Sequence, residues 1–187
     1  MNILILCDSK STDENVNLLS GLKNILTDLN HEVNTIVLNH DDLQPCTGCF
    51  GCWVKTPGKC VITNDSANSI ASEQINADAL ILLSEITFGG FSGEGKAFLD
   101  RSIQNILPVF ELYKGEMHHP KRYERTPVWI AIGYGDVSEA EQQIFHRLAD
   151  RNALNKRPER HLALTVVNSN ELIEKIPELK QILEVSR

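Results

Sequence analysis

Four of the five cysteines in this sequence lie within one short stretch, where their type and spacing suit redox or metal chemistry. They stand as C-x2-C-x2-C-x7-C at Cys46, Cys49, Cys52 and Cys60. Two-residue spacings let successive thiolates surround one compact centre. This favours ligation of a 4Fe–4S cluster over zinc, because structural zinc usually takes two separated pairs. Metal-free thiols and zinc stay open as alternatives. The remaining Cys7 ends an apolar run and is expected to be an inert core residue.

Hydroxyl and amide side chains crowd the segment 8–15, which leads into an amphipathic stretch. The N-terminus of a helix presents free N–H groups and a partial positive charge, so this position suits a phosphate group. The candidate phosphate ligands are Ser9, Ser11 and Asn15. The alternative is an ordinary helix cap, which uses the same residue types without any ligand.

Two further loops contain closely spaced glycines, which let a backbone approach a planar ligand and offer it N–H groups. The first loop contains the candidate binding residues Thr87, Phe88, Gly89, Gly90, Phe91 and Ser92. Its two phenylalanines could flank an aromatic ring. The second loop contains Gly133, Tyr134 and Gly135. Because Ser138 stands where a dinucleotide-binding fingerprint has its third glycine, we interpret this loop as a second wall of the same pocket.

The elements that position these loops alternate along the chain. Short apolar runs typical of buried strands occupy 3–7, 31–38, 77–86, 127–132 and 162–167. Amphipathic stretches typical of helices occupy 13–29, 65–75, 92–106, 138–152 and 170–185. In the last of these, Pro177 is acceptable only if a first short turn ends before it. The alternation predicts a parallel sheet with helices on both faces. Ligands of such sheets bind outside the carboxyl ends of the strands, where all these loops lie.

Two stretches lack a clear period. Residues 41–64 hold the cysteines and are expected to form a loop, and residues 107–126 are expected to form a long irregular connection. The most apolar run, 77–86, is expected at the centre of the sheet. The length of 187 residues favours a single domain that spans 1–187.

The composition argues against several classes of partner. Lys and Arg number 18 against 25 Asp and Glu, so the formal net charge is −7 and general binding to nucleic acid or anionic membranes is not expected. No apolar run reaches the ~18 residues that span a bilayer, and the first residues show no signal-peptide pattern. We therefore expect a cytoplasmic protein.

The three loops together resemble those of the flavodoxin-like NADPH-dependent FMN reductase family, and within it the iron–sulfur flavoproteins. That family carries a block of the form S-P-x-Y-x-G-x-x-S-x-x-x-K-x-F-[IL]-D-R, which stands here as SEITFGGFSGEGKAFLDR over residues 84–101. The specific part is its ending, Lys96, Phe98, Leu99, Asp100 and Arg101. The cysteine run also fits the family's pattern. The resemblance covers about residues 1–155.

This resemblance implies a flavodoxin-like three-layer sandwich with a five-stranded parallel sheet in the order 2-1-3-4-5. It also implies FMN as the cofactor, with Ser9, Ser11 and Asn15 at the phosphate. The loop 87–92 would line the isoalloxazine, and the loop 133–135 would lie on its other side. Asp100 and Arg101 would form a structural pair, with solvated surface charge as the equal alternative. A homodimer or homotetramer is expected from the same resemblance.

The functional hypothesis is an FMN-binding oxidoreductase. Electrons would pass from NAD(P)H through flavin to a small acceptor or to an iron–sulfur cluster, and no catalytic residue is assigned because flavin carries the reaction. The sequence departs from the family's pattern in the first loop at Asp8, Ser11 and Val16. It also departs near the second loop at Glu85 and Thr87. These departures motivate the alternative, a non-enzymatic electron carrier or redox-sensing module without reductase activity.

Overall fold

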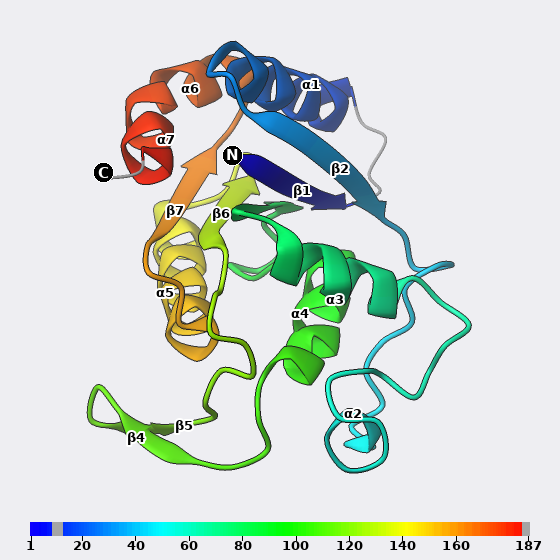
Figure 1. The fold of residues 1–187 in the computed structure, drawn as a ribbon. Coiled ribbons are helices and arrows are strands. Elements are labelled where there is room, and N and C mark those ends of the chain that lie inside the picture. The colour runs from blue at the N-terminus through cyan, green and yellow to red at the C-terminus, as the bar shows by residue number, and fades with distance from the viewer. Residues whose placement is uncertain (9–12, 185–187) are drawn as a thin grey trace.

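A five-stranded parallel sheet forms the centre of the protein (Figure 1). A computed structural model describes residues 1–8 and 13–184. The sheet contains β1 (Asn2–Asp8), β2 (Glu32–Leu38), β3 (Ala79–Glu85), β6 (Val128–Tyr134) and β7 (His161–Val166). Their spatial order is β2-β1-β3-β6-β7, which confirms the predicted flavodoxin-like order of five strands. As predicted, the most apolar strand, β3, lies in the middle, where all of its residues except the last are buried.

Helices cover both faces of the sheet. One face carries α1 (Asp13–Asp28), α6 (Ser169–Glu174) and α7 (Ile176–Leu183), whose leucines join a buried cluster with β1 and β3. The other face carries α3 (Ala67–Asn76), α4 (Gly93–Arg101) and α5 (Glu139–Lys156). The predicted C-terminal helix is divided before Pro177, which stands in the first turn of α7 where no N–H is required. Within the two described ranges, no helix has the length and hydropathy needed to cross a bilayer.

The two stretches without a clear period contain regular structure that the sequence did not predict. The loop 41–64 contains the short helix α2 (Gly51–Val54). The connection 107–126 contains a hairpin of β4 (Glu111–Tyr113) and β5 (Glu116–His118), so the prediction of an irregular connection was wrong there. Lys114 and Gly115 turn this hairpin with φ angles of 50° and 83°. Two successive left-handed residues match the twist of a two-residue hairpin, but a lysine is an uncommon choice for the first of them.

The helix predicted over 92–106 also ends earlier than expected. The α-helix α4 stops at Arg101, and a 3-10 turn, η1 (Ser102–Asn105), completes the segment. Pro108 follows, and a proline has no N–H with which to continue the helical hydrogen bonds.

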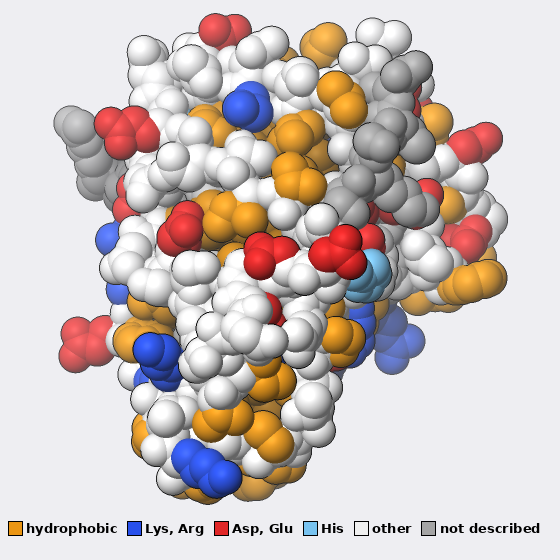
Figure 2. All heavy atoms as spheres, turned by 90° about the vertical axis from the view of Figure 1, so that its right-hand side faces the viewer, with side chains coloured by type: hydrophobic (Ala, Val, Ile, Leu, Met, Phe, Trp, Pro, Cys, Tyr) orange, Lys and Arg blue, Asp and Glu red, His pale blue; other side chains and the backbone are white. Residues whose placement is uncertain are grey.

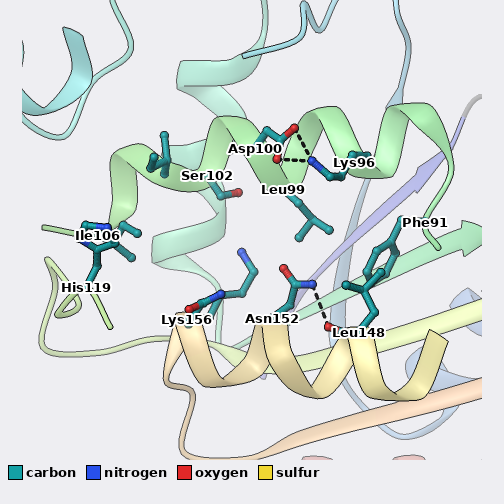
Figure 3. A pocket seen from close by; sticks show the side chains of 12 residues that line it. Phe91, Lys96, Leu99, Asp100, Ser102, Ile106, His119, Leu148, Asn152 and Lys156 are labelled. Carbon is teal, nitrogen blue, oxygen red and sulfur yellow. Dashed lines mark hydrogen bonds and ion pairs between the residues drawn. The ribbon is translucent and has the colours of Figure 1, made fainter. Parts of the chain in front are cut away.

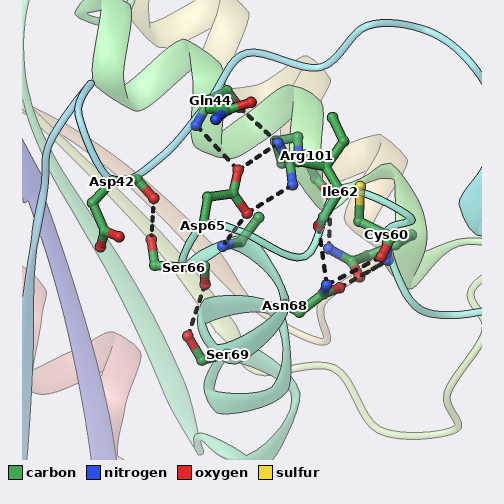
Figure 4. Close-up of polar contacts among 11 residues, drawn as sticks. Asp42, Gln44, Cys60, Ile62, Asp65, Ser66, Asn68, Ser69 and Arg101 are labelled. Atoms are coloured by element: carbon green, nitrogen blue, oxygen red, sulfur yellow. Dashed lines mark hydrogen bonds and ion pairs between the residues drawn. The ribbon is translucent and has the colours of Figure 1, made fainter.

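A buried ion pair anchors the cysteine-bearing loop to the helical layer (Figure 4). Arg101 donates from Nη1 to Asp65 Oδ2 at 2.8 Å and from Nη2 to Asp65 Oδ1 at 3.0 Å. Nη1 also donates to the backbone carbonyl of Gln44 at 2.8 Å, just before the first cysteine of the run. The side chains of Arg101 and Asp65 are 2% and 0% exposed. This pair therefore joins the end of α4, the start of α3 and the cysteine loop at one buried point.

The expected pairing of Asp100 with Arg101 was wrong. Successive side chains of a helix point in different directions, so Asp100 and Arg101 do not face each other. Asp100 is exposed and accepts from Lys96 Nζ at 2.5 Å, one turn earlier on the same helix.

We predict that Arg101→Met lowers the free energy of unfolding by about 3–5 kcal/mol, because it leaves the Asp65 carboxylate buried without its cation. Urea denaturation followed by circular dichroism measures this loss. Lys96→Met is the matched control, since it breaks the exposed pair with Asp100, and its cost should stay below about 1 kcal/mol. Equal losses in the two variants would contradict the anchoring role of Arg101.

Candidate functional site

A buried carboxylate joins the carboxyl ends of three neighbouring strands. Asp8, the last residue of β1, is 1% exposed. Its Oδ1 accepts from Asn15 Nδ2 at 2.8 Å and from the Tyr134 hydroxyl at 2.6 Å. Its Oδ2 accepts from the backbone N–H of Glu85 at 2.7 Å. The network thus connects the ends of β1, β3 and β6 with the first turn of α1.

Tyr134 acts in this network as a hydrogen-bond donor. Burial raises the pKa of Tyr134 well above its usual value, and the adjacent Asp8 carboxylate raises it further. The phenol therefore stays protonated at neutral pH and keeps donating to Asp8. Asn15 also donates to the Tyr134 oxygen at 2.6 Å, so the three side chains form one closed group.

The loop after β3 forms a tight turn that exposes Phe88 and packs Gly89 against α5. Thr87 N–H donates to the Gly90 carbonyl at 3.0 Å, and Gly90 N–H donates to the Thr87 carbonyl at 2.9 Å. Between them, Phe88 and Gly89 have φ angles of 52° and 76°. A left-handed conformation is unfavourable for a phenylalanine, and such strain concentrates at functional sites. The Phe88 residue is 92% exposed.

The tip of this turn also offers hydrogen-bond donors. Within residues 1–8 and 13–184, the N–H groups of Phe88 and Gly89 have no acceptor. A side chain at Gly89 is excluded, because its Cβ would lie 2.8 Å from Ile144 Cγ2 on α5 and φ is positive. The turn therefore places the exposed Phe88 ring beside two unpaired N–H groups, of which that of Gly89 belongs to a buried residue.

Two serines hold the base of the same loop. Ser92 caps α4 by accepting from Gly95 N–H at 3.2 Å. Its own N–H donates to the Ser84 Oγ at 2.9 Å, and the two hydroxyl oxygens lie 3.1 Å apart. Both serines are buried. Ser92 therefore fixes the loop to the end of β3, and its hydroxyl is engaged within the protein.

The remaining loop residues that the sequence indicated serve packing. Phe91 is buried with its ring centroid 5.0 Å from that of Phe145. A Cβ at Gly133 would lie 2.8 Å from both Ile86 and Phe145, so only glycine fits there. Gly135 has a φ angle of 133°, and its N–H donates to the Val166 carbonyl at 3.1 Å. Ser9 and Ser11 lie outside the described residues.

All four clustered cysteines line one small cavity beside the buried ion pair. The cavity is bounded by Cys46, Cys49, Cys52 and Cys60 together with Phe50, Ile62, Arg101 and Ile103. Cys49 is exposed, Cys52 is buried and the other two are half-buried. Nearby, Val54 on α2 and the preceding Phe50 are exposed apolar residues. Figure 2 shows apolar side chains gathered on the lower part of the face that it presents. The tertiary structure thus brings the whole run to one place.

The thiols of this cavity differ in acidity. Hydrogen bonds from the Gly51 N–H and the Thr47 hydroxyl lower the pKa of Cys49. Burial raises the pKa of Cys52, and the neighbouring Cys60 adds to that effect. Among the described residues, no group of three acidic, histidine or cysteine side chains has the geometry to hold a metal ion. Cys7 lies apart in the core, where burial raises its pKa to about 12.

Sequence reasoning did not find the role of Asp8 or of Asp65. One signal was present for Asp8, since a carboxylate that directly follows a fully apolar strand must be buried with partners or exposed at the ligand-binding edge. No local signal marks Asp65 as the partner of Arg101, because the two residues are 36 positions apart.

Comparisons with known proteins agree with this geometry. A family model described as NADPH-dependent FMN reductase matches residues 1–158. An iron–sulfur flavoprotein of Methanocaldococcus jannaschii is 41% identical over 71 residues. That aligned stretch covers 38% of this chain and only 35% of the relative.

Solved structures share the fold at low identity. A flavone reductase superposes with a TM-score of 0.62 at 14% identity, covering 97% of this chain and 60% of that one. An FMN-dependent NADH-azoreductase of Bacillus anthracis, solved in complex with FMN, gives a TM-score of 0.59 at 12% identity, with 97% and 96% of the chains covered. The family match extends over most of the sequence, from the first strand to the end of α5. The chain therefore belongs to the NADPH-dependent FMN reductase family.

Proposed function

We propose that this chain is an FMN-dependent oxidoreductase that passes electrons from NAD(P)H to a small acceptor. The observation that carries the proposal is the turn at Thr87–Gly90, which places unpaired N–H groups and the exposed Phe88 ring directly after the central strand. In a doubly wound sheet, ligands bind at this edge. Membership of the FMN reductase family supports flavin as that ligand.

The described residues fit the ring of a flavin. The N–H groups of Phe88 and Gly89 would donate to its polar edge, and the Phe88 side chain would cover part of one face. Bound FMN supplies the capacity to accept a hydride and to release electrons to an acceptor. Fixed N–H donors favour negative charge at the ring edge without reorganisation, which is the protein's contribution to such chemistry. The Phe88 side chain would exclude water from the part of the flavin ring that it covers.

One observation supports the alternative of an electron carrier or redox-sensing module without reductase activity. Asp8 holds both the Asn15 amide and the Tyr134 hydroxyl, so these donors are engaged within the protein. A buried carboxylate at the start of the first loop also adds negative charge near the proposed phosphate position. Both features weaken the binding of a phosphate relative to a site with a glycine at this position.

We also propose that the cysteine cavity holds an iron–sulfur cluster as a second electron-transfer centre. Its support is the compact cysteine spacing together with the placement of all four thiols around one cavity. The 41% identity with an iron–sulfur flavoprotein over part of the chain agrees with this proposal. Arg101 also lies at the cavity wall, where Asp65 balances its charge.

We predict that Phe88→Ala weakens FMN binding about tenfold, because an aromatic side chain stacked on a heterocyclic ring contributes about 1–3 kcal/mol. Quenching of FMN fluorescence on titration with protein measures the affinity. Phe110→Ala is the matched control, since Phe110 is also an exposed phenylalanine, 64% exposed, in the connection before the β4–β5 hairpin. Its affinity should equal that of the wild type.

The same samples distinguish the two functional hypotheses. Anaerobic addition of NADH or NADPH to the FMN-loaded protein should bleach the flavin absorbance in the oxidoreductase. Flavin that binds without being reduced would leave the electron-carrier alternative. Failure of FMN to bind at micromolar concentration would overturn both.

We predict that protein purified without oxygen contains about four iron atoms per chain and that Cys52→Ser removes most of them, since a cubane cluster needs four thiolate ligands. Iron and acid-labile sulfide analysis, with zinc measured in parallel, checks this. Cys7→Ser is the control, because Cys7 is buried in the core away from the cavity and its loss should leave the iron content unchanged. Equal iron in the wild type and Cys52→Ser would contradict the cluster.

A further inference from the structure

A second cleft lies between α4 and α5 (Figure 3). It shares Ile103 with the cysteine cavity and includes Phe91, the residue that follows the turn at Thr87–Gly90. Its volume is about 310 Å³, at the lower end of the ~300–1,000 Å³ typical of small-molecule sites. Apolar side chains from both helices and from η1 line part of it, among them Leu99, Ile103 and Leu148, and polar side chains such as Asn152 and Lys156 line the rest. The cleft thus has the size and the walls of a site for a small molecule with an apolar part and a polar group.

Lys156, the last residue of α5, is the unusual polar group in this cleft. Figure 3 shows its side chain extending from α5 into the space toward α4. Its Nζ lies 5.3 Å from the ring centroid of Phe98 and 5.2 Å from that of Trp129. Within residues 1–8 and 13–184, this amine makes no hydrogen bond or ion pair. Among the described residues, two aromatic faces therefore supply the only favourable electrostatic contacts of this amine.

The other charged and titratable groups that line the cleft are already engaged. Lys96 Nζ lies 2.5 Å from Asp100 Oδ1 on the same helix. His119 Nδ1 lies 3.0 Å from the Val109 carbonyl. No acidic side chain is thus left for Lys156. Burial lowers the pKa of Lys156 to about 8, because the site solvates the charged amine poorly.

We propose that this cleft binds a small apolar monocarboxylic acid, with its carboxylate on the Lys156 amine and its hydrocarbon part against Leu99 and Leu148. The carboxylate of the ligand supplies the anionic partner that Lys156 lacks among the described residues. One amine matches one negative charge. The apolar walls disfavour a strongly hydrated dianion such as phosphate, and the carboxylate of Asp100 repels a second charge. This site is independent of the proposed flavin function and requires no bound cofactor.

The pH dependence of binding follows from the lowered pKa. Below about pH 8 the amine is charged and attracts the carboxylate. Binding of an anion favours the protonated amine, so the pKa of Lys156 is higher in the complex than in the free protein. The affinity therefore falls as the pH rises above the pKa of Lys156 in the free protein. The same fall is not expected for a variant that lacks the amine, because Lys96, Asp100 and His119 remain unchanged in both proteins.

Isothermal titration calorimetry of the purified 187-residue chain with benzoate at pH 7 tests the proposal. We expect saturable binding of benzoate, with benzyl alcohol bound at least about tenfold more weakly because it lacks the charge. Lys156→Met keeps the length and apolar stem of the side chain and should lose the preference for benzoate. Lys180→Met is the matched control on the exposed face of α7 and should bind benzoate like the wild type. Circular dichroism of each variant verifies that it is folded.

A second measurement reports on the cleft itself. Trp129 lies beside the Lys156 amine, so benzoate should change the tryptophan fluorescence in a Trp53→Phe background, and Lys156→Met should abolish that change. No saturable binding up to millimolar benzoate would overturn the proposal. Equal affinity of the wild type and Lys156→Met would overturn it too. Tighter binding of inorganic phosphate than of benzoate would reject the apolar monocarboxylate as the ligand class.

Discussion

A charge that is removed from water must find partners inside the protein, and the carboxylate of Asp8 finds its partners on three other segments. It accepts hydrogen bonds from Asn15 on α1, from Tyr134 on β6 and from the backbone at Glu85 on β3. These donors come from the elements that meet at the carboxyl edge of the sheet. The requirement to satisfy one buried carboxylate therefore sets the relative position of the strand ends from which the candidate flavin loops begin.

The same constraint organises the opposite helical layer. Arg101 and Asp65 satisfy each other with two hydrogen bonds in a nearly solvent-free environment, and the guanidinium also takes the Gln44 carbonyl. Such a pair costs desolvation, so its net gain in stability is small, but its loss on one side is expensive. Its structural effect is to hold the cysteine loop against α4. The four thiols thereby line one cavity.

Lys156 differs from both of these groups. Its amine lies beside the rings of the core residues Phe98 and Trp129 and lacks an acidic partner among the described residues, yet Lys156 also lines an open cleft. Proteins rarely leave a buried charge without compensation, because burying an isolated ion costs several kcal/mol of folding free energy. Removing one partner of a buried ion pair destabilises a protein by ~3–5 kcal/mol. An incompletely satisfied charge beside open volume is a physical sign of a binding site, whereas Asp8 and Arg101 are signs of structure.

The sequence by itself determined the alternation of strands and helices, the central place of β3 and the three loops at the carboxyl edge. Burial on both faces and helical periodicity are local properties, and so the pattern of residue types reports them directly. The interruption before Pro177 followed from the same kind of local rule. The β4–β5 hairpin did not, since its turn residues Lys114 and Gly115 give only a weak local signal.

Only the tertiary structure decided which polar side chains satisfy one another. Asp8 meets Glu85 and Tyr134 across 77 and 126 positions of chain, and Arg101 meets Asp65 across 36. Such pairings depend on which strand ends and helix ends come together in space, and no periodicity in the chain encodes that. For the same reason, several loop residues expected at a ligand proved to have packing or capping partners, and the unpaired Lys156 became visible only once its surroundings were known.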